Sequence, residues 1–196
     1  MLQGKNGQET YTKSLISVGS NLSSTAGDVQ ATVLVALELL AAEAVTITAQ
    51  SRLFRTPAFP PGAGPDFVNA ALEVTTALSP EALLAVLHGV EKRLGRTRKT
   101  RWEARILDLD LLAYGAEILP DRGVYDHWLN LSPEAQRSAA PSELVLPHPR
   151  LQDRAFVLIP LMDIAPDWRH PCLGKTIAEL ATALPAPDVA DIVPLQ

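Results

Sequence analysis

Cysteine is nearly absent from the sequence: Cys172 is the single example among 196 residues, so no disulfide can form within the chain. A reducing, intracellular setting is therefore expected. Long apolar runs are also missing, which argues against a membrane-spanning helix. Residues 1–13 are polar and lack the apolar segment of a signal peptide. We therefore expect a cytoplasmic protein with no membrane partner, which begins with a loose tail over residues 1–13.

Several common binding motifs are missing as well. The sequence has neither the Walker A loop of P-loop nucleotide sites nor the Gly-x-Gly-x-x-Gly pattern of dinucleotide-binding folds. Its four histidines show no paired metal-ligand spacing. His170 and Cys172 are close in sequence, but nothing nearby completes a zinc site with four ligands. These absences argue against a P-loop, a dinucleotide site and structural zinc.

The composition is that of a globular protein, with 47% hydrophobic and 20% charged residues. The length suits one domain, which we place at residues 14–196. The net charge of -5 argues against binding to nucleic acid. Residues 92–105 are a local exception, because they are strongly basic and lead directly to Asp108 and Asp110. Charge alone leaves two interpretations of this stretch, a solvated loop or a site for an anionic ligand.

Apolar spacing predicts alternating strands and helices. The expected strands are 15–18, 45–48, 67–76 and 105–114, and the expected helices are 29–40 and 80–94. Gly19-Ser20-Asn21 is expected to form a turn, and the proline-rich residues 56–65 a loop. This order predicts an α+β fold, a ferredoxin-like antiparallel sheet with helices packed around it as an α/β/α sandwich.

The second half of the chain has a weaker pattern. Residues 121–142 read as an insertion, with a short helix opening at Ser132-Pro133-Glu134. A further strand is expected at 144–146, and helices at 156–164 and 176–184, the first of them disturbed by Pro160.

The sharpest chemical feature is the pair Asp108 and Asp110. Residues two apart on a strand point the same way, so both carboxylates share one face while Leu107, Leu109 and Leu111 share the other. Two carboxylates held close together repel each other unless a cation lies between them. Magnesium suits such a site, because it takes oxygen ligands from one or two carboxylates and from a substrate phosphate. The alternative is an acidic, solvent-facing sheet edge.

Cations precede this pair. The basic loop holds Arg96, Arg98, Lys99, Arg101 and Arg105, with Trp102 among them. The planar guanidinium group matches phosphate oxygens. Arginines beside a carboxylate-bound metal are typical of phosphoryl transfer, in which the protein positions groups and offsets developing charge. Such a loop, together with the proline-rich loop, could close over substrates and exclude water.

A third feature lies on the strand expected at 67–76. Phe67 and Asn69 share a face by the same alternation. A ring beside an amide suits a flat heterocycle, because the amide both donates and accepts hydrogen bonds. The alternative for Phe67 is a core residue.

Taken in order, the motifs of the chain resemble one enzyme family. They are Gly19-Ser20-Asn21, Arg55-Thr56-Pro57, Phe67-x-Asn69-Ala70-Ala71, Glu91, Gly95-Arg96-x-Arg98, Arg105-x-x-Asp108-Leu109-Asp110, Leu146-Pro147-His148-Pro149 and Arg154-x-Phe156. Over residues 14–184 the chain resembles the 6-hydroxymethyl-7,8-dihydropterin pyrophosphokinases (HPPK) of folate biosynthesis. The resemblance implies transfer of the diphosphate of ATP to 6-hydroxymethyl-7,8-dihydropterin, with release of AMP.

The resemblance also implies roles for single residues. Asp108 and Asp110 would hold two magnesium ions, with Arg96 and Arg105 completing the catalytic set. The residues placed around ATP are Glu91, Arg98, Trp102, Leu111, His148 and Arg154, and those placed around the pterin are Thr56, Pro57, Phe67, Asn69 and Phe156. The expected partners are therefore the two small substrates, with the protein itself a monomer.

Three departures from the family pattern are visible. Glu103 stands where glycine is usual, the basic loop is a residue shorter than in some relatives, and residues 121–142 are longer. We expect no fused downstream enzyme in this chain. Two other functions stay open: a ferredoxin-like module that binds a ligand without catalysis, and a different magnesium-dependent transferase.

Overall fold

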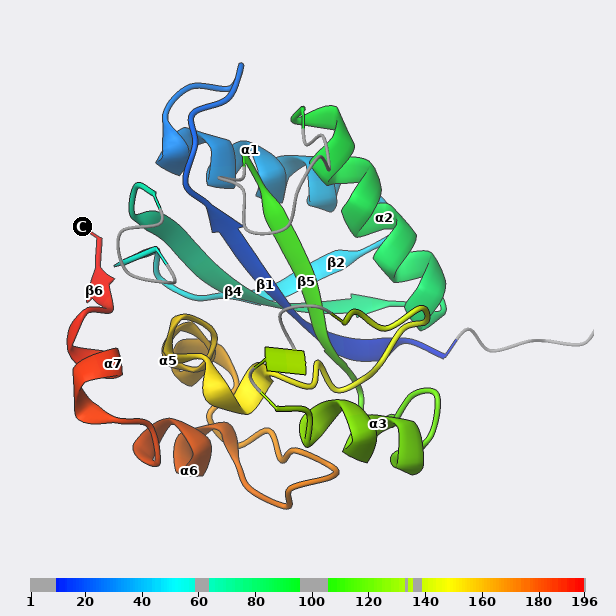
Figure 1. Cartoon of the computed structure of the whole chain (residues 1–196). Helices are drawn as coiled ribbons and strands as arrows, with labels where there is room; N and C mark the ends of the chain where they lie inside the picture. The colour runs from blue at the N-terminus through cyan, green and yellow to red at the C-terminus, as the bar shows by residue number, and fades with distance from the viewer. Residues whose placement is uncertain (1–9, 59–63, 96–105, 133, 136–138, 196) are drawn as a thin grey trace, which may run out of the picture.

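The computed structural model describes residues 10–58, 64–95, 106–132, 134–135 and 139–195. Its elements alternate as the sequence predicts in the first half and become mainly helical in the second (Figure 1). The strands are β1 (Thr12–Ser20), β2 (Thr46–Gln50), β3 (Phe54–Thr56), β4 (Phe67–Thr76), β5 (Asp108–Tyr114) and β6 (Val193–Pro194). The helices are α1 (Val29–Ala41), α2 (Pro80–Arg93), α3 (Arg122–Leu129), α5 (Ala155–Ile164), α6 (Ile177–Thr182) and α7 (Ala186–Ala190), with a 3-10 turn at Leu151–Asp153.

The six strands form one sheet in the order β5-β1-β4-β3-β6, and β2 also pairs with β4. Every pairing is antiparallel. β2 pairs with residues 72–75 of β4, whereas β3 pairs with residues 67–69, so β2 and β3 share one edge of β4. The predicted antiparallel, ferredoxin-like sheet is thereby confirmed.

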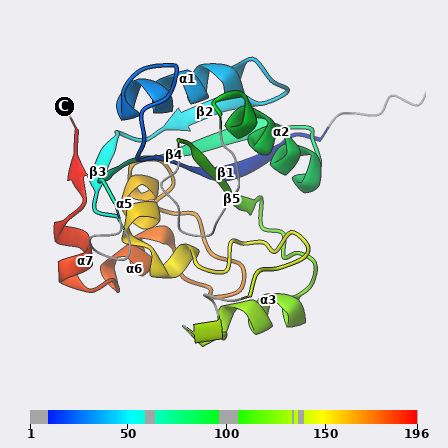
Figure 2. The same ribbon diagram turned by 45° about the horizontal axis from the view of Figure 1, so that its top comes forward.

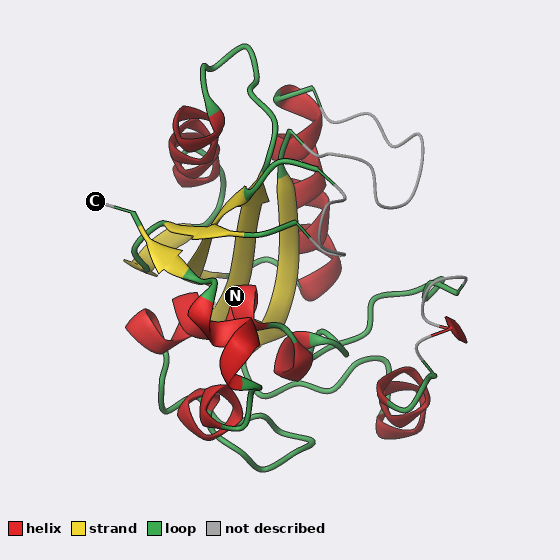
Figure 3. Ribbon diagram, turned by 60° about the vertical axis from the view of Figure 1, so that its left-hand side comes forward, coloured by secondary structure: helices red, strands yellow, loops and turns green. Residues whose placement is uncertain are grey.

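Each face of the sheet carries its own apolar core. On one face, side chains such as Val18 and Leu72 pack against α1 and α2, and on the other, Ala71 and Leu112 pack against α5 and α6. Figure 2 and Figure 3 show the strands between these two groups of helices. The alternation of side chains along each strand decides which core a residue joins.

Helix ends follow the expected chemistry. The Ser79 side chain accepts a hydrogen bond from the Ala82 amide at the start of α2, with Pro80 in the first turn. Gly95, just beyond α2, has a φ of 92°, which glycine adopts without steric cost. At α6, Thr176 and Glu179 form a capping box, so this helix begins at the predicted place but ends earlier.

Several boundaries differ from the prediction. Gly19 and Ser20 are the last residues of β1 and not part of a turn, and β1 begins at Thr12, inside the expected tail. The strand expected at 144–146 is an isolated bridge between Leu119 and Leu146. β3, β6, α3 and α7 were not predicted, because they are too short to show a clear period or carry few apolar residues.

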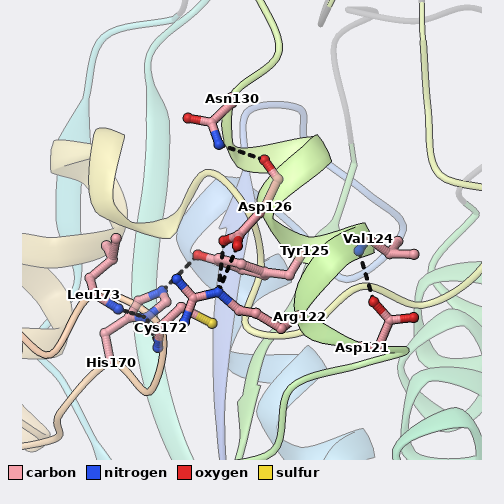
Figure 4. Close-up of polar contacts among 9 residues, drawn as sticks. All are labelled: Asp121, Arg122, Val124, Tyr125, Asp126, Asn130, His170, Cys172 and Leu173. Carbon is pink, nitrogen blue, oxygen red and sulfur yellow. Dashed lines mark hydrogen bonds and ion pairs between the residues drawn. The ribbon is translucent and has the colours of Figure 1, made fainter.

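A buried polar contact joins α3, in the segment interpreted as an insertion, to the region around His170 (Figure 4). Asp121 caps α3 by accepting from the Val124 amide. The fully buried Tyr125 places its hydroxyl 3.0 Å from Nε2 of His170. Nδ1 of His170 accepts from the amides of Cys172 and Leu173. His170 is therefore a neutral imidazole whose Nε2–H donates to Tyr125.

This contact predicts a pH dependence of stability. Burial, with repulsion from Arg122, lowers the pKa of His170 from 6.5 to about 4. Between pH 6.5 and 4 the unfolded chain binds a proton that the folded chain rejects, so the free energy of unfolding should fall as the pH falls through this range. Urea denaturation at pH 7 and pH 5 measures the fall. His170→Gln keeps a donor but cannot titrate, so its fall should be smaller; equal falls in both proteins would contradict the assignment.

Candidate active site

β1 lies between the two strands that carry the predicted site residues. Gly19 of β1 pairs with Asn69 of β4 on one side and with Asp108 of β5 on the other. Ser17 pairs in the same way with Ala71 and Asp110. Side chains of directly paired residues lie on the same face of a sheet. The register therefore brings Asn69 and the aspartate pair to one face, the face that α5 covers.

The aspartate pair occupies the position that strand alternation predicts. Asp108 and Asp110 are half-buried, while Leu109 between them is buried in the core on the α1 and α2 side. Nη1 of Arg154, just before α5, lies 3.5 Å from Oδ2 of Asp110. A guanidinium thus stands beside one of the two carboxylates.

His148 lies beside the same strand. Its amide donates to the carbonyl of Leu112 at 2.8 Å, and its Nδ1 accepts from the Arg150 amide. Burial, followed by repulsion from Arg154, lowers the pKa of His148 to about 3, although the negative charge of Asp108 opposes the shift. His148 is therefore neutral and holds its remaining proton on Nε2.

Glu91 supports the backbone between the two aspartates. β5 is the last strand of the sheet, so groups on its outer edge need partners from elsewhere. Glu91, on α2 and only 2% exposed, accepts a hydrogen bond from the Leu109 amide at 2.8 Å. The sequence resemblance had placed Glu91 around ATP; in the structure its carboxylate holds the strand that carries the aspartates.

A second group of side chains gathers where β3 meets β4. Asn69 is 3% exposed, and its Nδ2 donates to Oγ1 of the buried Thr56 at 2.6 Å. Phe67, two residues before Asn69, is half-buried. Phe156, on the first turn of α5, is also half-buried, and the Arg154 guanidinium lies 5.6 Å from the centre of its ring. Arg154 is thereby next to both the Phe156 ring and the Asp110 carboxylate.

Gly19 lies between Asp108 and Asn69 in the sheet, and it is in close contact with the Asn69 side chain. A side chain at this position would place its Cβ 2.5 Å from Oδ1 of Asn69. The missing side chain therefore makes room for the buried amide. The last residue of β1 and the residue after it hold the neighbouring segments in place: Ser20 Oγ donates to the Ile106 carbonyl at 2.5 Å, and Asn21 Nδ2 to the Pro65 carbonyl at 3.3 Å. Glycine within a strand often marks such a close approach, but the sequence alone does not show that Gly19 lies in a strand beside Asn69.

The remaining predicted residues divide into two sets. Arg96, Arg98, Trp102 and Arg105 lie outside the described residues, as does Glu103. Leu111 is 3% exposed in the core against α1 and α2, so any contact that it makes with a nucleotide would come through its backbone. Pro57 is exposed at the end of β3.

Comparisons with known proteins identify the family. The family model of 7,8-dihydro-6-hydroxymethylpterin-pyrophosphokinase (HPPK) matches residues 15–166. The chain belongs to the HPPK family. Two relatives named 2-amino-4-hydroxy-6-hydroxymethyldihydropteridine pyrophosphokinase agree. The one from Synechocystis is 32% identical over 92% of this chain and 80% of its own, and the one from Methylorubrum extorquens is 37% identical over 80% and 84%.

The solved structures agree on the fold. Wild-type Plasmodium falciparum HPPK-DHPS superposes with a TM-score of 0.61 at 16% identity, over 90% of this chain and 42% of that one. This HPPK thus spans less than half of that longer chain.

The enzyme is a pyrophosphokinase of folate biosynthesis, which transfers the diphosphate of ATP to 6-hydroxymethyl-7,8-dihydropterin and releases AMP. The predictions of family, activity and fold are confirmed. Neither a non-catalytic binding module nor a transferase with another substrate agrees with these matches.

Replacing Gly19 tests the packing of Asn69. In Gly19→Ala the new Cβ would displace the Asn69 amide, so we expect pterin to bind about tenfold more weakly while the affinity for an ATP analogue changes little. Calorimetric titration of both ligands measures this. Gly89→Ala on α2 is the matched control, because a Cβ there meets nothing within 4 Å. An unchanged pterin affinity in Gly19→Ala would show that Asn69 is not needed in this position.

Replacing Glu91 tests the support of the aspartate strand. Glu91→Ala leaves the buried Leu109 amide without this acceptor, and we expect the free energy of unfolding to fall by about 1–3 kcal/mol. If the aspartates bind magnesium as the sequence predicts, the magnesium concentration for half-maximal activity should rise as well, because they lose a fixed backbone. Glu91→Gln keeps an acceptor oxygen and should stay close to the parent enzyme in both measurements. Equal defects in the two variants would point to the charge of Glu91 rather than to this hydrogen bond.

Proposed function

We propose that the face of the sheet around Gly19 is the catalytic site, with ATP and magnesium at β5 and the pterin at β3 and β4. The observation that carries this assignment is the register of Gly19 with both Asn69 and Asp108. It makes the two substrate sites neighbours across one strand, as a direct transfer between two substrates requires.

Asp108 and Asp110 are proposed to hold two magnesium ions. The donor set fits, because hard cations take carboxylate oxygens, and both side chains lie half-buried on one face of a rigid strand. Among the described residues no group of three or more His, Cys, Asp or Glu could hold a metal by itself. Phosphate oxygens of ATP would therefore supply further ligands, which is the usual arrangement for magnesium.

The pterin is assigned to Phe67, Asn69, Phe156, Thr56 and Pro57. Phe67 and Phe156 are half-buried rings from β4 and α5, which suits stacking on a flat heterocycle. The Thr56 hydroxyl accepts a hydrogen bond from Nδ2 of Asn69. This bond fixes the orientation in which the amide would meet the edge of the pterin. Phe67 and Asn69 lie on the face of the sheet that is covered by α5, the helix that carries Phe156.

The nucleotide is assigned to the β5 side, with contacts from His148, Arg154 and the backbone around Leu111, and with Glu91 behind the strand. Arg98 and Trp102 are proposed to bind ATP too, and Arg96 and Arg105 to assist transfer. Neutral His148 presents an Nε2–H donor, which suits a phosphate oxygen.

In the proposed reaction the hydroxymethyl oxygen attacks the β-phosphorus of ATP, and AMP leaves. When bound, magnesium offsets the charge that builds on the phosphate oxygens. Asn69 and the two rings orient the pterin so that its hydroxyl faces the nucleotide. Arg154, next to both Asp110 and Phe156, is placed to stabilise negative charge between the two substrates.

We further propose a cytoplasmic monomer whose partners are the two substrates, without nucleic acid or membrane. The net charge of -5 supports the absence of nucleic-acid binding. Within the described residues, no helix combines the length and the apolar character that crossing a bilayer requires.

Removing one aspartate tests the metal assignment. Asp110→Ala should abolish turnover, measured as pterin-dependent AMP by chromatography, because magnesium loses a protein ligand. Its thermal unfolding should stay close to that of the parent, since Asp110 is half-buried and Arg154, 3.5 Å from it, is partly exposed. The exposed Glu117, just beyond β5, provides the control variant Glu117→Ala, which should keep full activity. Comparable turnover with and without Asp110 would refute the assignment.

A further inference from the structure

The last part of the described chain pairs with the strand that carries Thr56. α7 and β6 follow residue 184 and lie beyond residues 15–166, which the family model matches. β6 pairs antiparallel with β3, with Pro194 opposite Phe54 and Val193 opposite Arg55. The Leu195 amide donates to the Leu53 carbonyl at 2.8 Å. Figure 3 shows this strand at the margin of the sheet. We call residues 186–195 the C-terminal clasp.

The hydrogen bonds between β6 and β3 follow the pattern of an antiparallel ladder. Hydrogen-bonded and non-hydrogen-bonded pairs alternate between antiparallel strands. Because Leu195 and Leu53 are hydrogen-bonded, the neighbouring pair of Pro194 and Phe54 is the non-bonded kind. Proline has no N–H, so it is tolerated at this position. Pro194, the residue of β6 that cannot donate, thus stands where no donor is needed.

β3 needs support on its outer edge. It has three residues and pairs with β4 only over residues 67–69. So short a strand with an open edge is marginal. Its last residue is Thr56, whose hydroxyl accepts from Asn69 Nδ2 at 2.6 Å. The position of the Asn69 amide therefore depends on a strand that β4 and β6 hold from opposite sides.

The clasp also lies against the segments next to β3. A depression of about 320 Å³ is lined from one side by Arg55, Pro57 and Asp66, and from the other by Ala190, Asp191 and Val193. Nε of Arg55 lies 4.0 Å from Oδ2 of Asp66, so β3 and the residue just before β4 also meet there. The clasp thus pairs with the backbone of β3. It also borders Pro57, which follows β3, and Asp66, which precedes β4.

We propose that the C-terminal clasp is a positioning element for the pterin site: it holds β3 in register so that Thr56 can orient Asn69. The clasp touches no substrate in this proposal, which rests on the assignment of Thr56 and Asn69 to the pterin. The nucleotide site is on β5, separated from β3 by β4 and β1. Loosening the clasp should therefore weaken pterin binding and leave nucleotide binding unchanged.

A matched pair of variants at one residue tests this. Leu195→Pro removes the N–H that donates to Leu53, whereas Leu195→Ala shortens the side chain and keeps the N–H. Calorimetry would measure the Kd of a non-hydrolysable ATP analogue with magnesium, and then the Kd of 6-hydroxymethyl-7,8-dihydropterin in its presence. We expect roughly fivefold weaker pterin binding in Leu195→Pro, which is the value of one hydrogen bond. Leu195→Ala should stay within about twofold, and so should the analogue with both variants.

Three outcomes would overturn the proposal. They are pterin affinity in Leu195→Pro equal to the parent, an equal loss in Leu195→Ala, and a parallel loss of nucleotide affinity or of the whole fold, which would make the clasp a general support. Thr56→Val separates this from the site assignment, because it removes the hydroxyl that Asn69 contacts. If Thr56→Val leaves pterin binding unchanged, the site assignment fails; if it weakens binding and Leu195→Pro does not, only the clasp proposal fails.

Discussion

The register of β1 with its two neighbours is the constraint on which the site depends. β1 pairs with β4 over residues 12–20 and with β5 over residues 14–19. A slip of one residue would turn every side chain of a strand to the opposite face. Asp108 and Asp110 would then enter the apolar core, and Leu109 would take their place on the face of the proposed site. Helices pack apolar side chains against both faces of the sheet. Such a slip is strongly disfavoured, because it would bury the two carboxylates and expose leucine.

The free edge of β5 is secured by polar groups from outside the sheet. Glu91 bonds to the Leu109 amide, and the His148 amide bonds to the Leu112 carbonyl. These two bonds fall on either side of Asp110, so the carboxylates stand on a backbone that is fixed along both of its edges. A metal site gains from such rigidity, because its ligands need little reorganisation when the ion binds.

Strand alternation accounts for what could be predicted of the site. It placed Asp108 with Asp110, and Phe67 with Asn69, and the structure keeps these pairs together. The same rule puts Leu111 with the core leucines, where the structure has it, whereas the family resemblance alone had placed it near ATP. Where the two kinds of inference differ over a side chain, the alternation is the more direct physical argument.

Other features left little trace in the sequence. β3 and β6 have three and two residues, too few to show a period, and their pairing depends on contacts between distant parts of the chain. α3 has Tyr125 as its one buried residue and is attached by a polar contact to His170, so its apolar pattern is faint. Gly19 was interpreted as a turn residue, because glycine within a strand becomes informative only when its neighbour on the next strand is known.

The sheet itself sets the spacing between the two proposed substrate sites. Adjacent strands lie about 4.8 Å apart, so Asn69 on β4 and Asp108 on β5, both opposite Gly19, are separated by about 10 Å across β1. Since Gly19 has no side chain, the space above β1 at this point is left to the Asn69 amide and to whatever binds beside it. A span of this size suits a hydroxymethyl group on one side and a metal-bound phosphate on the other. In the proposed site the two substrates would fill this span from opposite sides, so that the hydroxymethyl oxygen comes within about 3.5 Å of the β-phosphorus, as direct transfer requires.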